Sequence, residues 1–133
     1  MNEPTHAAPL DGTWQMLRAE HDGEQAPEMV VQRTTLEFSH GAYRACFDGE
    51  PIDQGQFEVS LSGSAKTLVL RGTSGPNTAR TIRCIYQQVG DRLRVCYGLD
   101  GIQPTDFTTT TGQKRYLATY RRTRSTPHSK TAG

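Results

Sequence analysis

Residues 82–97 read IRCIYQQVGDRLRVCY and contain the pattern that decides the fold. Apolar side chains recur at every second position on both sides of Gly90-Asp91. This alternation is typical of strands with one buried face, and a Gly-Asp pair between two such runs indicates a tight turn. The stretch therefore predicts a β-hairpin with an apolar face made of Ile82, Cys84, Tyr86, Leu93, Val95 and Tyr97.

The same alternation continues in both directions along the chain. Its further members are Trp14 and Met16; Leu36 and Phe38; Tyr43, Ala45 and Phe47; Phe57, Val59 and Leu61; Leu68 and Leu70; and Tyr116, Ala118 and Tyr120. Together with the hairpin they give about eight strands. Closing eight antiparallel strands on themselves removes the exposed edges and encloses either packed side chains or one small ligand. We predict an all-β protein, a single eight-stranded antiparallel up-and-down barrel.

The chain of 133 residues is long enough for one core and too short for two ordinary domains. Residues 1–9 and 123–133 are polar and show no apolar period, so we expect disordered tails there and a barrel domain over 10–122. One short helix is expected near residues 27–33, over one opening of the barrel, because PEMVVQR begins with a proline.

Charge and composition bear on the partners and the location. Fifteen basic and fourteen acidic residues leave a net charge of +1, which does not favour nucleic-acid or anionic-membrane binding. The apolar runs are too short for a signal peptide or a membrane span. Three cysteines cannot all pair within one molecule, so reduced thiols are expected. We expect a soluble, cytoplasmic protein without membrane insertion.

Two short motifs resemble the lipocalin and calycin superfamily. They are Gly12-Thr13-Trp14 at the start of the first strand and Tyr120-Arg121-Arg122 at the end of the last. The resemblance implies that Trp14 closes the narrow end of the barrel under an arginine from the last strand. Arg122 has the parity of Tyr120, and a cation–π contact of this kind contributes roughly 0.5–2 kcal/mol. The alternative is that Trp14 is an ordinary core residue without an arginine partner.

Longer stretches are similar to an uncharacterised, lipocalin-like bacterial domain family that is abundant in planctomycetes. They are LDGTWQMLRAEHDGE, IYQQVGDRLRVCYGLDG, QPTDF and LATYRR, and the resemblance covers residues 10–122. It implies a fold, because no activity is established for that family.

Few residues suggest chemistry. The histidines fall in the tails or beside turns: His6, His21, His40 and His128. Cys84 and Cys96 flank one hairpin with opposite parity, which disfavours a disulfide between them. We therefore predict no metal site, no cofactor and no catalytic residue.

Asp106, in the stretch PTDF, has two interpretations. It could orient a ligand or act as a base at the barrel rim, or it could accept backbone hydrogen bonds in a turn whose Phe107 enters the core. The Gly-rich stretch GTSGPN, residues 72–77, leads into a strand and is therefore interpreted as a turn rather than a phosphate loop.

The barrel interior is the remaining candidate site, for a small and largely apolar ligand. Tyrosine hydroxyls at positions 43, 86 and 97 would orient it. The predicted ligand-binding residues are Phe38, Tyr43, Phe57, Leu70, Tyr86, Val95 and Tyr97. A cavity and a packed core require the same residues, so both stay open.

Two alternatives to ligand binding remain. One is a structural or protein-interaction module with a filled barrel and an exposed apolar patch that begins at Ile85 and Leu117. The other is an enzyme that uses the cavity, such as an isomerase or cyclase, which would need a charged group inside the barrel.

Overall fold

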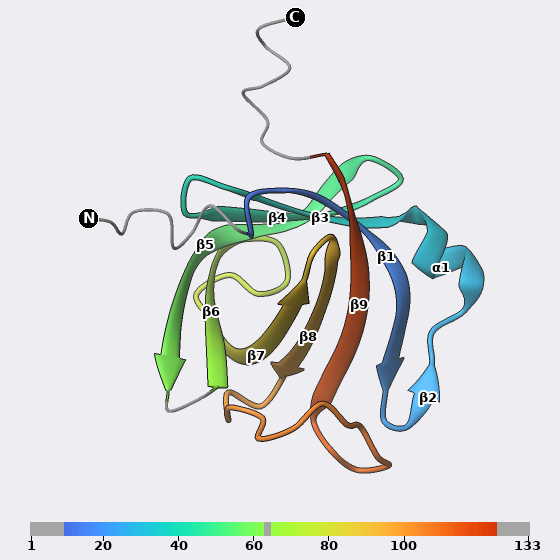
Figure 1. The fold of residues 1–133 in the computed structure, drawn as a ribbon, viewed down its shortest axis with the longest axis vertical. Helices are drawn as coiled ribbons and strands as arrows, with labels where there is room; N and C mark the ends of the chain where they lie inside the picture. The colour runs from blue at the N-terminus through green and yellow to red at the C-terminus, as the bar shows by residue number, and fades with distance from the viewer. Residues whose placement is uncertain (1–9, 63–64, 125–133) are drawn as a thin grey trace, which may run out of the picture.

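The computed structural model describes residues 10–62 and 65–124 and has a closed antiparallel β-barrel (Figure 1). Within these residues the barrel strands are β1 (Gly12–His21), β3 (Thr34–Ser39), β4 (Ala42–Phe47), β5 (Glu50–Ser62), β6 (Ala65–Ser74), β7 (Thr81–Val89), β8 (Arg92–Gly98) and β9 (Arg115–Arg124). Each pairs with the next, and β9 pairs with β1 to close the sheet. The prediction of an eight-stranded up-and-down barrel is confirmed.

Tight turns hold neighbouring strands in register. His40 and Gly41 join β3 to β4 with φ of 52° and 82°, and Asp48 and Gly49 join β4 to β5 with φ of 55° and 83°. Two-residue hairpin turns with positive φ at both positions match the twist of the strands that they connect. The Asp48-Gly49 turn thus sets the register between β4 and β5.

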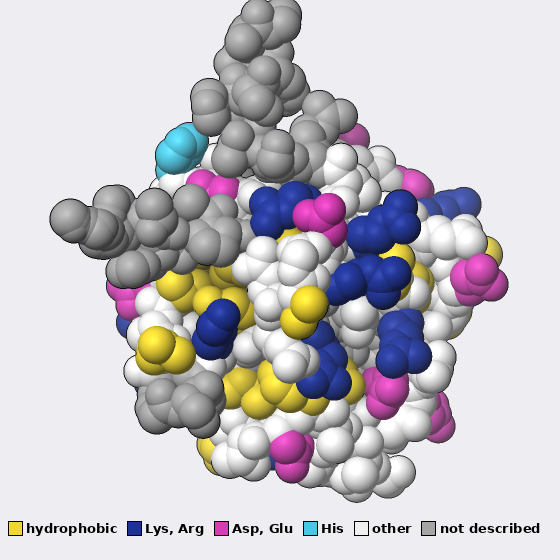
Figure 2. Space-filling view, viewed as in Figure 1, with side chains coloured by type: hydrophobic (Ala, Val, Ile, Leu, Met, Phe, Trp, Pro, Cys, Tyr) yellow, Lys and Arg dark blue, Asp and Glu magenta, His cyan; other side chains and the backbone are white. Residues whose placement is uncertain are grey.

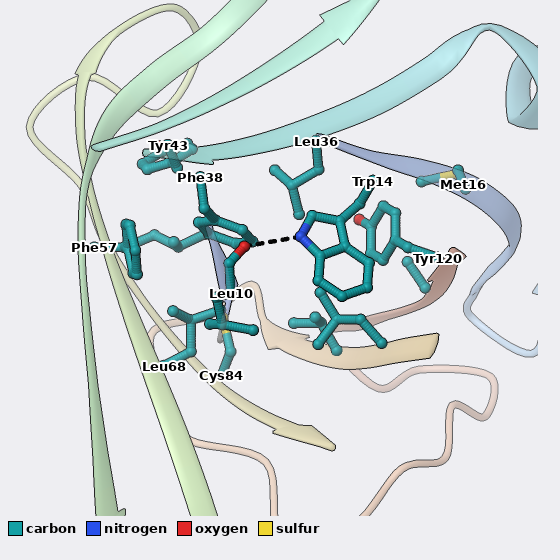
Figure 3. Packing of buried hydrophobic residues seen from close by; sticks show 14 of the residues in the cluster. Leu10, Trp14, Met16, Leu36, Phe38, Tyr43, Phe57, Leu68, Cys84 and Tyr120 are labelled. Carbon is teal, nitrogen blue, oxygen red and sulfur yellow. Dashed lines mark hydrogen bonds between the residues drawn. The ribbon is translucent and has the colours of Figure 1, made fainter. Parts of the chain in front are cut away.

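One end of the barrel is filled by large apolar side chains (Figure 3). The Trp14 side chain is fully buried, and its Nε1 donates a hydrogen bond of 2.9 Å to the Leu10 carbonyl oxygen. Deeper in the barrel, the Phe38 and Phe57 rings meet edge to face with centroids 4.7 Å apart. This end therefore has the close packing of a protein core.

Arg122 covers Trp14 from β9. Its Cζ lies 4.5 Å from the centroid of the indole ring, so the cation–π pair expected from the sequence is present. Its Nη1 donates to the Asp11 carbonyl oxygen at 2.5 Å, and its Nε lies 3.5 Å from Oδ1 of Asp91 in the β7–β8 turn. One guanidinium thus joins the first strand, the last strand and a hairpin turn.

The connection between β1 and β3 contains a two-residue strand, β2 (Glu24–Gln25), which was not predicted, and the helix α1 (Glu28–Arg33), close to the range expected. Val31 of α1 joins the buried cluster, and Thr34 and Thr35, directly after it, lie at the open end of the barrel. The helix therefore borders the opening, while the described residues that line the cavity at this end come from other elements.

Residues 99–114, here called the outer segment, pack against the outside of the barrel. Phe107 lies under Arg94 of β8, with the Arg94 Cζ 4.1 Å from the ring centroid. The segment lies beside Ile85 and Leu117, and Ile85 is only 5% exposed. The expectation of an exposed apolar patch beginning at these two residues is wrong, because the outer segment covers that wall.

Two further expectations need correction. Phe107 does not enter the barrel core but lies on its outer wall beneath Arg94. Strand β9 continues to Arg124, so the barrel ends two residues beyond the predicted boundary at 122. Both predicted tails otherwise lie outside the described residues.

We expect Arg122→Ala to lower the free energy of unfolding by about 2–3 kcal/mol, because it removes a cation–π contact and a charge-assisted hydrogen bond. Denaturant unfolding measures this loss. The matched control is Arg121→Ala, whose exposed side chain lies directly opposite Arg92. Because like charges on neighbouring strands repel, this control should be neutral or slightly stabilising. Equal losses in the two variants would contradict the proposed role of Arg122.

Candidate functional site

The barrel is hollow at the end opposite Trp14. A cavity of about 270 Å³ opens there, between the first residues of β3, β5 and β9 and the β6–β7 connection. Apolar and aromatic side chains form most of its wall. The lining consists of Met16, Thr34, Thr35, Leu36, Tyr43, Ala45, Ile52, Asp53, Leu70, Pro76, Asn77, Ile82, Tyr97, Leu99, Tyr116 and Tyr120.

The residues predicted for ligand binding divide between the two halves of the barrel. Tyr43, Leu70 and Tyr97 line the cavity. Phe38, Phe57 and Val95 do not; each is at most 5% exposed, and all three belong to the buried cluster of the barrel interior. The remaining residue, Tyr86, packs against that cluster and also lies outside the cavity lining.

Six polar lining residues are absent from the predicted site residues: Thr34, Thr35, Asp53, Asn77, Tyr116 and Tyr120. The alternation in YLATY already places both of these tyrosines on the inward face, so that signal was available. Asp53 was missed because β5 begins seven residues before the first apolar residue used to predict it, Phe57. Asn77 belongs to the stretch GTSGPN, which was interpreted only as a turn.

Asp53 holds the β6–β7 connection over the cavity. Its Oδ2 accepts hydrogen bonds from the Tyr43 hydroxyl at 3.1 Å and from Asn77 Nδ2 at 2.9 Å, and its Oδ1 accepts one from the Asn77 backbone N–H at 3.3 Å. Gly75 allows the close approach: with φ of 98°, a Cβ there would lie 2.9 Å from Oδ1 of Asp53. The Gly-rich turn thus forms part of the cavity mouth.

Two tyrosines meet on the other side of the cavity: Tyr120, which is buried, and Tyr97, which is half-buried. The hydroxyl oxygens of Tyr97 and Tyr120 are 2.7 Å apart. A hydrogen bond between two hydroxyls uses one of their two protons. The pair therefore keeps one O–H that can donate to a molecule in the cavity.

Burial sets the protonation of these phenols. Desolvation is the largest cause that raises the pKa of Tyr97 and Tyr120, and it also raises the pKa of Tyr43, where the neighbouring Asp53 carboxylate adds to the effect. The same cause raises the pKa of the Cys84 thiol, which is fully buried in the barrel. At neutral pH the cavity therefore presents neutral hydroxyl donors, and Cys84 is an unreactive thiol.

The other candidate groups lie away from the cavity. His21 and His40 are exposed, and the described residues contain no group of three or more His, Cys, Asp or Glu suited to a metal ion. Cys46, Cys84 and Cys96 are free and buried. Cys84 is part of the interior cluster, whereas Cys96 faces the outer segment.

Asp106 belongs to the outer segment and not to the barrel rim. Its Oδ1 accepts hydrogen bonds of 2.7 Å from the Thr108 hydroxyl and from Arg115 Nη1. The Thr108 hydrogen bond and then the Arg115 contact lower the pKa of this exposed carboxyl. These contacts fit a residue that stabilises the outer segment, and they give no support to a base or ligand contact at the rim.

Larger hollows on the outside are less suited to a ligand. One of about 570 Å³ lies between β7 and the outer segment, but its lining includes the exposed side chains of Lys66, Gln87 and Val89. It is therefore a groove open to solvent. Figure 2 shows that Lys and Arg side chains gather over β8, β9 and β1, so this outer wall is basic, unlike the cavity.

Comparison of the chain with protein-family models, with curated proteins and with solved structures gave no match. In the described part of the chain, no helix has the length and apolar character needed to span a membrane.

We expect the tyrosines to resist ionisation until the barrel unfolds. Burial raises the pKa of all five above the ordinary value of 10.0. Below that value both the folded and the unfolded chain keep their phenols protonated, so these groups add no pH dependence. Above it, only the unfolded chain ionises readily, so the free energy of unfolding falls as pH rises.

Tyrosinate absorbance at 295 nm and circular dichroism, recorded together during an alkaline titration, measure this effect. The two signals should change in one transition above pH 10, while the chain in denaturant titrates near 10. Full tyrosinate absorbance near pH 10 with an intact barrel would contradict the burial of these hydroxyls.

Proposed function

We propose that the protein binds a small, largely apolar molecule non-covalently in the open half of the barrel. The observation that carries this proposal is the division of the interior. Trp14, Phe38 and Phe57 fill one half, whereas the other half keeps a cavity of about 270 Å³. A barrel that served only as a scaffold would gain stability by filling both halves, because apolar surface removed from water contributes about 25 cal/mol per Å².

The lining also supports this function. It is mostly apolar, with hydroxyl groups from Tyr43, Tyr97 and Tyr120 at defined positions, as in small-molecule sites generally. The volume lies slightly below the usual range of about 300–1,000 Å³. An apolar cavity of about 150 Å³ is already large enough for benzene. The proposed ligand is therefore a single compact molecule of roughly the size of a substituted benzene.

We further propose that the chain is a lipocalin-like protein, close to the bacterial domain family named above. The supporting features are the closed barrel and the pair of Trp14 and Arg122. A cytoplasmic location fits the three free, buried cysteines, because reducing compartments keep thiols unpaired.

The alternatives receive less support. An interaction module would use an apolar outer patch, but the outer segment covers Ile85. An enzyme requires a charged group in the cavity, and Asp53 is one. Its carboxylate already accepts hydrogen bonds from Tyr43 and Asn77, which favours a role in holding the β6–β7 connection in place at the mouth.

Filling the cavity tests the proposal. Ala45 lines it from β4, whereas Ala42 is an exposed residue of the same strand. We expect ethylbenzene to shift the amide NMR signals of Tyr43, Leu70, Ile82 and Tyr97 in the unaltered protein. Ala45→Phe should abolish these shifts because its ring occupies the site.

The control variant Ala42→Phe should bind ethylbenzene as the unaltered protein does. A cooperative thermal transition and an unchanged circular dichroism spectrum establish that each variant is folded. Ethylbenzene shifts that survive in folded Ala45→Phe, or that are absent from the unaltered protein, would refute binding in this cavity.

A further inference from the structure

We infer that the cavity selects neutral molecules that carry a hydrogen-bond acceptor, such as an aryl ketone, and rejects carboxylates of the same shape. This inference rests on the proposed function and names the class of ligand. It follows from the positions of the polar groups on the two sides of the barrel and from the charge of the lining.

The Tyr97–Tyr120 pair supplies the donor. Tyr97 comes from β8 and Tyr120 from β9, and each of the two hydroxyls has the other as its hydrogen-bond partner. Whichever hydroxyl accepts in this pair keeps its own proton for another partner. That proton lies in a mostly apolar cavity, where a donor without a hydrogen-bond partner is unfavourable. A ligand carbonyl oxygen would satisfy it.

Asp53 supplies the charge that discriminates. In the closed strand order, β4 is four strands away from β8, and β5 is four strands away from β9. In a barrel of eight strands, four strands away is the opposite side. Asp53 on β5 therefore faces the tyrosine pair across the cavity. It is the one charged residue of the described lining, which contains no Lys, Arg or His.

A carboxylate ligand would meet two penalties in this cavity. It would lose its hydration without gaining a cationic partner, and it would lie near the Asp53 carboxylate in a medium of low dielectric constant. A neutral ketone of the same size meets neither penalty. The arginines that could bind an anion, such as Arg92 and Arg121, point away from the interior on the outer wall.

Three probes of nearly equal shape test the inference: ethylbenzene, acetophenone and benzoate. At pH 7, amide NMR titrations of the unaltered protein should give a dissociation constant for benzoate at least tenfold above that for acetophenone. Benzoate binding as tightly as acetophenone would overturn the inference. If none of the three binds, ethylbenzene included, the proposed function itself fails.

Tyrosine variants test the donor. Either single variant, Tyr97→Phe or Tyr120→Phe, leaves one hydroxyl whose proton is no longer shared, so each should weaken the binding of acetophenone relative to ethylbenzene less than the double variant does. The double variant leaves no hydroxyl. It should raise the dissociation constant of acetophenone about tenfold more than that of ethylbenzene. Equal changes for the two probes in the folded double variant would overturn the role of the pair.

Asp53→Asn tests the charge through a gain of binding, which damage to the fold would not produce. The amide oxygen can still accept from Tyr43 while the negative charge is lost. The dissociation constant of benzoate should fall several-fold relative to that of acetophenone, and this ratio cancels any change in the mouth that affects both probes, such as loss of the hydrogen bond from the Asn77 backbone N–H. An unchanged ratio of the two dissociation constants would show that Asp53 does not exclude anions.

Discussion

Pairing between β1 and β9 is the contact on which the rest of the structure depends, because it converts a sheet with two edges into a closed wall. The same pairing brings Trp14 beside Arg122 and Met16 beside Tyr120. A register shift between Met16 and Arg18 then changes which side chains of β1 face inward, so that Ala19 points into the barrel and joins the buried cluster. One pair of strands thus determines both the filled end and part of the cavity wall.

Closure has a different consequence at each end of the barrel. At the Trp14 end, turns of two residues leave little room, and large aromatic rings fill the space between the strands. At the other end the β4–β5 turn is also short, but the three other connections are longer: the β1–β3 connection with α1, the β6–β7 connection and the outer segment. These connections frame an opening instead of filling it. The difference in loop length is therefore what separates a packed core from a cavity within one barrel.

The polar groups of the cavity come from segments with different tasks. Tyr97 and Tyr120 are inward positions of regular strands, where burial keeps their hydroxyls protonated. Asp53 and Asn77 are joined across the mouth by hydrogen bonds between β5 and the β6–β7 connection. The donor pair lies on one side of the cavity and the carboxylate on the other. Such an arrangement can orient a bound ligand, which a purely apolar lining could not do.

The sequence by itself determined the barrel, because a period of two in apolar residues and turn residues such as Asp48-Gly49 are local signals. It also identified Tyr43, Leu70 and Tyr97 as inward residues. It did not determine that Phe38, Phe57 and Val95 belong to the buried cluster outside the cavity lining, since depth along the barrel axis depends on strand register and stagger.

Only the tertiary structure decided which groups meet. Asp53 and Asn77 are 24 residues apart, and Tyr97 and Tyr120 are 23 apart, so no local pattern connects either pair. The outer segment likewise covers Ile85 through contacts that alternation does not encode, because the pattern treats every outward residue as exposed. Inward or outward direction is a local property of a strand, whereas enclosure depends on segments that are distant in the chain.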